Sequence, residues 1–160
     1  MIEKNTPMLL FRYNNYFKYS FIEEHKKIIE KENYVWIMKI GRPCNQSRLD
    51  NVTNNGGHII LKSPRKDGDN YYIGKYVEVI NSFPDKRQCM PNYYKCMEEK
   101  GELLGLKIQC FKVIKIEKLD SKDVEKIVML VNDRKVSEVI AETRTAVMFV
   151  YNTDIIYANF

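Results

Sequence analysis

The residues with the clearest chemical potential lie in one aromatic segment and in the polar segment that follows it. Tyr34-Val-Trp-Ile-Met-Lys-Ile-Gly-Arg42 contains Trp36, the only tryptophan, and residues 44–50 are rich in Asn, Ser and Arg. A flat ring beside adaptable hydrogen-bond donors and arginines is suited to hold an exposed base. A tryptophan in a strand is also typical of a core position. Two interpretations of Trp36 therefore stay open, a stacking platform and a core residue.

Basic residues flank this segment and recur at the tip of a predicted hairpin. Lysine and arginine side chains at such places hold phosphates and make binding depend on salt concentration. Asp67 and Asp69 partly cancel the charge of the hairpin tip, so a solvated turn is the alternative. The candidate phosphate-binding residues are Lys39, Arg42, Arg48, Lys62, Arg65 and Lys66.

No arrangement of nucleophile and base stands out in the sequence. His25 falls on the apolar face of a predicted helix, and no nucleophile can be assigned to His58. There is no glycine-rich phosphate loop and no metalloprotease motif. The cysteines lack C-x-x-C spacing and nearby histidines, which argues against structural zinc. The sequence therefore predicts a protein that is not an enzyme, with no catalytic residue, no metal and no cofactor.

Composition places the chain among ordinary globular proteins. Of its 160 residues, 44% are hydrophobic and 29% are charged, and the net charge is +5. This charge permits an anionic partner without requiring one. No apolar run reaches the roughly 20 residues of a membrane helix, and residues 1–7 lack the pattern of a signal peptide. We therefore expect a cytoplasmic protein with reduced thiols.

Hydrophobic periodicity and turn residues predict the order of the elements. Ser20, followed by Glu23, matches a capping box at the start of a helix. Residues 81–105 have no clean periodicity and are predicted to form a loop, while residues 127–131 fit either a helix or a strand. The predicted elements are strands at 7–13, 34–40, 58–62, 71–80, 106–119 and 145–151, and helices at 20–33, 47–52 and 136–142. They predict an α+β fold, a small mixed, partly closed β-barrel with flanking helices, in one domain over residues 1–160.

Several short motifs occur in a particular order along these elements. They are Leu10-Phe-Arg-Tyr-Asn-Asn-Tyr16, Val35-Trp36, Asn45-Gln-Ser-Arg-Leu-Asp50, Ile59-Ile-Leu-Lys-Ser63 with Gly74, Phe111-Lys-Val-Ile-Lys-Ile116 and Val139-Ile-Ala-Glu-Thr-Arg-Thr145. Over residues 8–151 this order resembles the YTH and EVE branch of the PUA-like superfamily. Members of that branch read modified bases, such as methylated adenine in RNA or modified bases in DNA, between aromatic rings.

The resemblance implies a single PUA-like domain that captures a base, modified in the family, in an aromatic pocket. It implies Trp36 as one wall of the cage and Asn14 as a contact to the base edge. Because Asn is also common in turns, a turn role is the alternative for Asn14 and Asn15. The candidate base-binding residues are Trp36, Asn14, Asn15, Tyr93, Tyr94 and Phe83. The implied partners are RNA or DNA, together with other domains or subunits of a larger system.

Two other functions stay open. An enzyme of the related ASCH type would act on RNA or nucleosides, with Lys39, Lys62 and Thr145 as the residues available for catalysis. A protein-interaction module would use the Tyr-rich segment Pro84–Cys96 to bind another protein.

Overall fold

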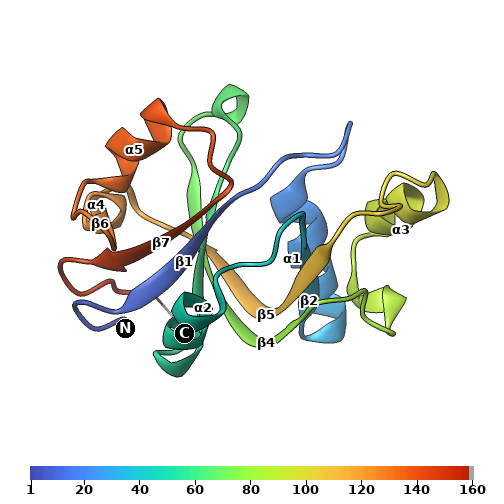
Figure 1. Cartoon of the computed structure of the whole chain (residues 1–160), viewed down its shortest axis with the longest axis horizontal. Coiled ribbons are helices and arrows are strands. Elements are labelled where there is room, and N and C mark those ends of the chain that lie inside the picture. The colour runs from blue at the N-terminus through green and yellow to red at the C-terminus, as the bar shows by residue number, and fades with distance from the viewer. Residues whose placement is uncertain (159–160) are drawn as a thin grey trace. The chain divides into compact units, whose positions relative to one another are not determined.

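A computed structural model describes residues 1–158 of the chain (Figure 1). These residues form an α+β fold with seven strands and five α-helices, and the mixed sheet does not close on itself. A partly closed barrel therefore stays a prediction. The strands are β1 (Pro7–Arg12), β2 (Val35–Ile40), β3 (His58–Lys62), β4 (Tyr71–Ile80), β5 (Ile108–Lys118), β6 (Ile127–Met129) and β7 (Val147–Asn152). The α-helices are α1 (Phe21–Glu32), α2 (Gln46–Asn54), α3 (Asn92–Glu99), α4 (Ser121–Val124) and α5 (Val136–Glu142).

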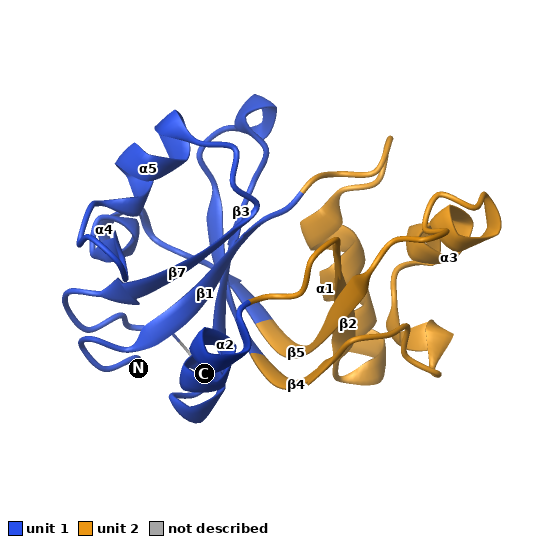
Figure 2. Cartoon of the chain, in the orientation of Figure 1, with its two compact units in different colours: residues 1–13, 45–75, 116–160 blue, residues 14–44, 76–115 orange. Residues whose placement is uncertain are grey.

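The chain divides into two compact units, shown in different colours in Figure 2. Unit 1 contains residues 1–13, 45–75 and 116–160, and unit 2 contains residues 14–44 and 76–115. Because the segments of the two units alternate along the chain, neither unit is a single continuous stretch. The prediction of one domain over residues 1–160 stays a prediction.

Unit 1 is built on a mixed set of strands in the order β4-β3-β1-β7-β6. β1 runs parallel to β3, with Leu9 opposite Ile59, and antiparallel to β7, with Leu9 opposite Phe149. β3 lies between β1 and β4, and all five of its residues are buried, as expected of an interior strand. The core of the unit consists of Ile2, Met8, Leu10, Ile60, Tyr71, Ile73, Leu119, Val124, Ile127, Val136, Ile140, Met148, Val150 and Ile156.

Unit 2 is built on the antiparallel pair β2 and β5, with Trp36 opposite Lys112. Helix α1 packs against β2 and buries Phe21, Ile22 and His25 on one face. Ser20 caps its first turn by accepting a hydrogen bond from Glu23 N, and Asn33 ends it in the left-handed conformation. The predicted helix and its cap are therefore confirmed.

The largest difference from the sequence-based prediction lies in residues 81–105. The prediction of an irregular loop is wrong, because this stretch contains a 3-10 turn, η2 (Arg87–Cys89), and helix α3. The open choice at residues 127–131 is decided in favour of strand β6. The hairpin of β3 and β4 and the helix at 136–142 are confirmed. Among the described residues, no helix has the length and apolarity needed to cross a membrane.

Candidate functional site

The structure brings the predicted aromatic residues together, but in a buried cluster rather than an open cage. Trp36 is 6% exposed, and Tyr93 and Tyr94 are each 3% exposed. They pack with Met38, Cys89, Met90, Leu103 and Cys110, and Phe83 packs against the cluster from outside. The reason is the placement of α3, whose two tyrosines join Trp36 in this cluster. In this structure Trp36 is a core residue of unit 2.

A hydrogen-bond network crosses the same core and holds Tyr94 in place. His25 is fully buried, and its Nδ1 lies 2.7 Å from the carbonyl oxygen of Phe21. Since a carbonyl can only accept, Nδ1 carries the proton, and Nε2 accepts from the Tyr94 hydroxyl at 2.7 Å. Met38 N in turn donates to Tyr94 Oη at 3.3 Å. Burial lowers the pKa of His25 to about 3, so its imidazole is neutral and structural.

The aromatic cluster reaches the surface of unit 2 at the loop Asn14–Tyr19, which we call the Phe17 loop. Tyr16 and Tyr19 both stack on the buried Tyr93 ring, with centroids 5.5 and 5.7 Å away. Phe17 lies beside Tyr16 in an edge contact at 4.6 Å and is itself 79% exposed. Its φ of +51° places a bulky side chain in the left-handed region. An exposed ring in strained backbone is uncommon, and it marks this loop as a candidate site.

Cations accompany the rings of the Phe17 loop. Lys100 Nζ lies 5.5 Å from the centroid of Phe17, and Lys18 Nζ lies 5.7 Å from that of Tyr19. The Tyr16 hydroxyl donates to the Glu102 carboxylate at 3.1 Å, which joins the loop to the segment after α3. Unit 2 as a whole contains thirteen Lys and Arg against nine Asp and Glu. The loop therefore combines an exposed aromatic face with positive charge.

The two asparagines at the start of this loop differ in role. Asn14 is exposed, whereas Asn15 Oδ1 accepts a hydrogen bond from Phe21 N at 2.9 Å, at the first turn of α1. Asn15 therefore has the structural role that Asn commonly takes beside a helix start. Only Asn14 is placed to meet a ligand at the surface.

We expect Asn15→Ala to lower the free energy of unfolding by about 1 kcal/mol, because it removes an acceptor from the first turn of α1. Asn15→Asp keeps an oxygen acceptor and should restore the wild-type value. Urea unfolding followed by circular dichroism measures both variants. Equal stability of Asn15→Ala and wild type would show that this hydrogen bond does not support the helix.

The six candidate phosphate-binding residues are divided between the units and between surface and interior. Lys39 and Arg42 lie in unit 2, and the other four lie in unit 1. Lys39 is 8% exposed and donates to the carbonyl oxygen of Arg42. Lys62 is 1% exposed and donates to Ser63 O at 2.8 Å. The ammonium groups of both lysines donate hydrogen bonds to backbone carbonyls. These two lysines are therefore buried, whereas the sequence predicted that they contact phosphates at the surface.

The two candidate arginines of unit 1, Arg65 and Arg48, also have partners. Arg65 is exposed, yet its Nη2 donates to the carbonyl oxygens of Ile140 and Ala141 at 3.0 and 2.9 Å, near the end of α5. Arg48 lies over the Phe149 ring at 5.9 Å. Lys66 and Arg42 are exposed. The hairpin tip is thus held against α5 by Arg65.

The residues considered for catalysis do not present a free lysine. Lys39 lies in unit 2, while Lys62 and Thr145 lie in unit 1. Burial lowers the pKa of Lys62, and Asp69 lies 3.6 Å from its Nζ. No group of three or more His, Cys, Asp or Glu residues within 1–158 is arranged to hold a metal ion. The tyrosines of the segment considered for protein binding, Tyr93 and Tyr94, belong to the core.

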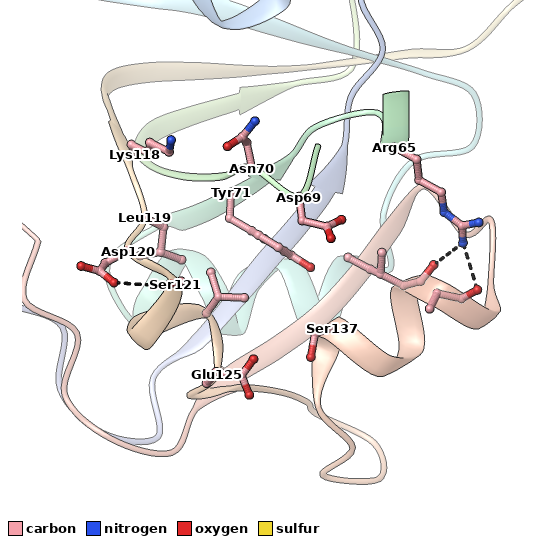
Figure 3. A pocket seen from close by; sticks show the side chains of 13 residues that line it. Arg65, Asp69, Asn70, Tyr71, Lys118, Leu119, Asp120, Ser121, Glu125 and Ser137 are labelled. Atoms are coloured by element: carbon pink, nitrogen blue, oxygen red, sulfur yellow. Dashed lines mark hydrogen bonds between the residues drawn. The ribbon is translucent and has the colours of Figure 1, made fainter. Parts of the chain in front are cut away.

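Unit 1 contains a separate cavity of about 990 Å³, shown in Figure 3. The β3–β4 turn, the β5–α4 junction and helix α5 surround it. Tyr71 lies across it, with its hydroxyl directed to the side of Asp69 and Ser137 (Figure 3). The remaining lining residues are Arg65, Asn70, Lys118, Leu119, Asp120, Ser121, Val124, Glu125, Ile140 and Ala141. Of the residues predicted from the sequence to bind a ligand, Arg65 alone lines this cavity.

Comparison of the chain with family models, with curated proteins and with solved structures finds no match. The likeness to the YTH and EVE branch therefore depends on the motifs of the sequence alone.

Sequence analysis missed Phe17, an aromatic residue whose side chain is 79% exposed. Phe17 lies in the run Tyr16-Phe-Lys-Tyr19, where aromatic and basic residues alternate directly after two asparagines. Interleaved aromatic and basic residues are the composition expected of a surface that binds single-stranded nucleic acid. The sequence therefore contained a signal for this loop. Only the structure shows that Phe17 is exposed and that Lys100 lies near its ring.

Proposed function

We propose that this chain is a non-enzymatic nucleic-acid-binding module of PUA-like type, which stacks an exposed base on the Phe17 loop. The observation that carries the proposal is the Phe17 ring, which is 79% exposed and has left-handed backbone. Folding gains little from an exposed ring in that conformation. Stacking of a ligand on the ring would offset the energetic cost of this conformation.

The chemistry of the loop fits a nucleic acid better than an uncharged partner. Every base has a flat face that can stack on an aromatic ring, so such contacts tolerate different sequences. Lys18 and Lys100 lie beside the rings of the loop and are placed to meet the phosphates next to a stacked base. Asn14, exposed at the start of the loop, offers both a donor and an acceptor to a base edge.

The proposal moves the stacking surface from Trp36 to Phe17 and keeps the class of partner. The proposal includes modified bases as ligands, because added methyl groups increase apolar contact with a ring. The four cysteines are all free, which supports the expected cytoplasmic location, where thiols stay reduced. The aromatic and basic side chains of the loop can bind either RNA or DNA. We also propose other domains or subunits of a larger system as partners.

The test uses fluorescein-labelled 12-nucleotide single strands of RNA and DNA, with and without methylated adenine, in anisotropy titrations. We expect Phe17→Asn to weaken binding about 5- to 100-fold, because it removes a stacking ring. Asn is tolerated in left-handed backbone, so the same variant should unfold at equal or higher urea concentration. Phe17→Tyr should bind like wild type.

A matched control is Tyr157→Ala, which removes an exposed ring of unit 1 that also has a lysine near its face. This variant should bind like wild type. Lys18→Ala and Lys100→Ala should each reduce the slope of log K against log salt by about 0.7, and Lys122→Ala in unit 1 should not. Equal binding by Phe17→Asn and wild type, or no binding at low salt, would overturn the proposal.

A further inference from the structure

Three basic side chains lie close together in unit 1, at the carboxyl ends of the parallel strands β1 and β3. Arg12 and Lys62 are the last residues of these strands and stand opposite each other in the register. Arg12 and Arg65 both donate hydrogen bonds to backbone carbonyls at the end of α5. These contacts hold the two guanidinium groups at the same end of one helix. We call Arg12, Lys62 and Arg65 the basic cluster.

The charge of the basic cluster is not balanced. Burial lowers the pKa of Lys62, and the charges of Arg12 and Arg65 lower it further, whereas Asp69 opposes this change. Asp69 Oδ1 lies 3.6 Å from Lys62 Nζ, and the Asp69 side chain is 89% exposed. Neither arginine forms an ion pair with any residue within 1–158. Three positive charges against one negative charge leave a net charge of +2 at this place.

The cavity of about 990 Å³ lies beside the basic cluster and is large enough for a small molecule. Arg65 is part of its lining. The Tyr71 ring connects the cluster with the cavity, because Lys62 Nζ lies 5.4 Å from the centroid of this ring. The Tyr71 hydroxyl is directed to the side of the cavity where Asp69 and Ser137 lie, which is also the side of Arg65 (Figure 3). The basic cluster and this hydroxyl therefore meet on one side of the cavity.

Hydrogen-bond donors on this side of the cavity are left without partners. Tyr71 is 5% exposed, and its hydroxyl makes no hydrogen bond within the described part of the chain. Burial raises the pKa of Tyr71 to about 12, so the hydroxyl carries its proton at neutral pH and can donate it. The Ser137 hydroxyl also has no partner among residues 1–158, and Arg65 uses only Nη2 for its contacts with α5. Because buried polar groups normally have a partner, a ligand that brings acceptors would complete this side.

The other carboxylates of the lining are already in use. Asp120 lies on the opposite side of the cavity from Arg65 (Figure 3), and its Oδ1 accepts from Lys122 N at 2.9 Å. Glu125 Oε2 lies 3.0 Å from Lys135 Nζ. Neither carboxylate forms an ion pair with the basic cluster.

We propose that this cavity binds a small phosphate monoester, whose phosphate accepts hydrogen bonds from the Tyr71 and Ser137 hydroxyls and from the Arg65 guanidinium. A phosphate monoester carries close to two negative charges at neutral pH, which match the net charge of +2 at the basic cluster. The planar fork of an arginine also matches the geometry of phosphate oxygens. The organic part of the ligand lies against the apolar lining residues Leu119, Val124 and Ile140.

Three ligands of similar size test the charge that the cavity selects. They are phenyl phosphate, which is a dianion, methyl phenyl phosphate, which has the single charge of a nucleic-acid linkage, and the cation 2-phenylethylamine. Chemical-shift changes in two-dimensional NMR of the full chain at about pH 7.5 measure their binding. We expect phenyl phosphate to bind, the diester to bind at least about 5-fold more weakly, and the amine not to bind. No binding of phenyl phosphate, or equal or tighter binding of the diester or the amine, would overturn the proposal.

Two variants that keep the contacts of Arg65 with α5 locate the bound phosphate. Asp69→Asn removes the carboxylate beside the phosphate and should tighten the binding of phenyl phosphate about 3- to 10-fold. Tyr71→Phe keeps the ring and should weaken it about 2- to 10-fold. Asp154→Asn makes the same change of charge elsewhere in unit 1 and should have no effect. An affinity that does not rise in Asp69→Asn, or does not fall in Tyr71→Phe, would place the phosphate elsewhere and reject the site.

This site does not involve the Phe17 loop. Phe17→Asn should therefore bind phenyl phosphate like wild type, whatever its effect on oligonucleotides. Failure of the phosphate site and failure of nucleic-acid binding are then separate results.

Discussion

Trp36→Ala is expected to lower the free energy of unfolding by about 3–5 kcal/mol, the usual cost of removing a large ring from a core. Trp36 is 6% exposed and packs among the sulfur, aliphatic and tyrosine side chains of unit 2. A loss of this size is a large fraction of the total stability of a typical domain. Urea unfolding followed by circular dichroism measures it, because the variant lacks the only tryptophan.

Two further variants keep this prediction decisive if Trp36→Ala does not fold. Trp36→Phe keeps a ring in the core and should cost less, about 1–2 kcal/mol. Tyr157→Ala removes an exposed ring and should change stability by no more than about 0.5 kcal/mol. If Trp36→Ala unfolds like wild type but loses oligonucleotide binding, Trp36 is the platform that its sequence context suggested, and its assignment to the core is wrong.

Acid should destabilise the protein well above the pH at which carboxylates titrate. The pKa of His25 falls from its ordinary 6.5 to about 3 on folding, because burial disfavours the charged ring. Between pH 6.5 and pH 3, His25 therefore binds a proton in the unfolded chain but not in the folded chain. The stabilising contribution of neutral His25 is complete above pH 6.5 and is lost progressively as the pH falls toward 3.

This linkage predicts a loss of about 2 kcal/mol between pH 7.5 and pH 5 from His25 alone. His58 acts in the same direction, since burial and the charge of Lys75 lower its pKa to about 4. Urea midpoints at several pH values measure the total, and His58→Gln leaves a slope near 1.4 kcal/mol per pH unit from His25. A stability that stays flat from pH 7.5 to 5 would show that the His25 ring is not sealed in the core.

The sequence predicted the elements whose local signals are strong. Helix α1 has a serine cap, acidic residues in its first turn and apolar residues at helical spacing, and the structure confirms it. The same spacing placed His25 on the buried face. The hairpin of β3 and β4 followed from alternating residues around a polar turn.

Helix α3 could not be found from local signals. Its cap is Pro91, which makes no side-chain hydrogen bond to the helix, so the cap position lacks the Ser, Thr, Asp or Asn that marks a helix start. Its tyrosines suggested a ligand-binding loop, whereas they fold inward onto Trp36. This tertiary packing stabilises the helix. A segment of eight residues is too short for its hydrophobic periodicity to predict such a helix from the sequence.

The candidate site shows the same division. The resemblance to the YTH and EVE branch grouped Trp36, Tyr93, Tyr94 and Phe83 as the walls of a cage, whereas the structure gathers the first three in a buried cluster with Phe83 packed against it. Elements that are distant in the sequence decide whether an aromatic ring of such a cluster is exposed to solvent or buried. Lys62 illustrates the point, since its place at a hairpin tip suggested exposure and its position on an interior strand buries it.

The position of β1 in unit 1 has a consequence for synthesis. β1 pairs with β7, whose residues 147–152 emerge from the ribosome about 140 residues later. At a translation speed of about 5–20 residues per second, this strand waits roughly 7–28 seconds for its neighbour. During that time one apolar edge of the nascent chain has no partner, and chaperones that cover exposed strands should bind it then.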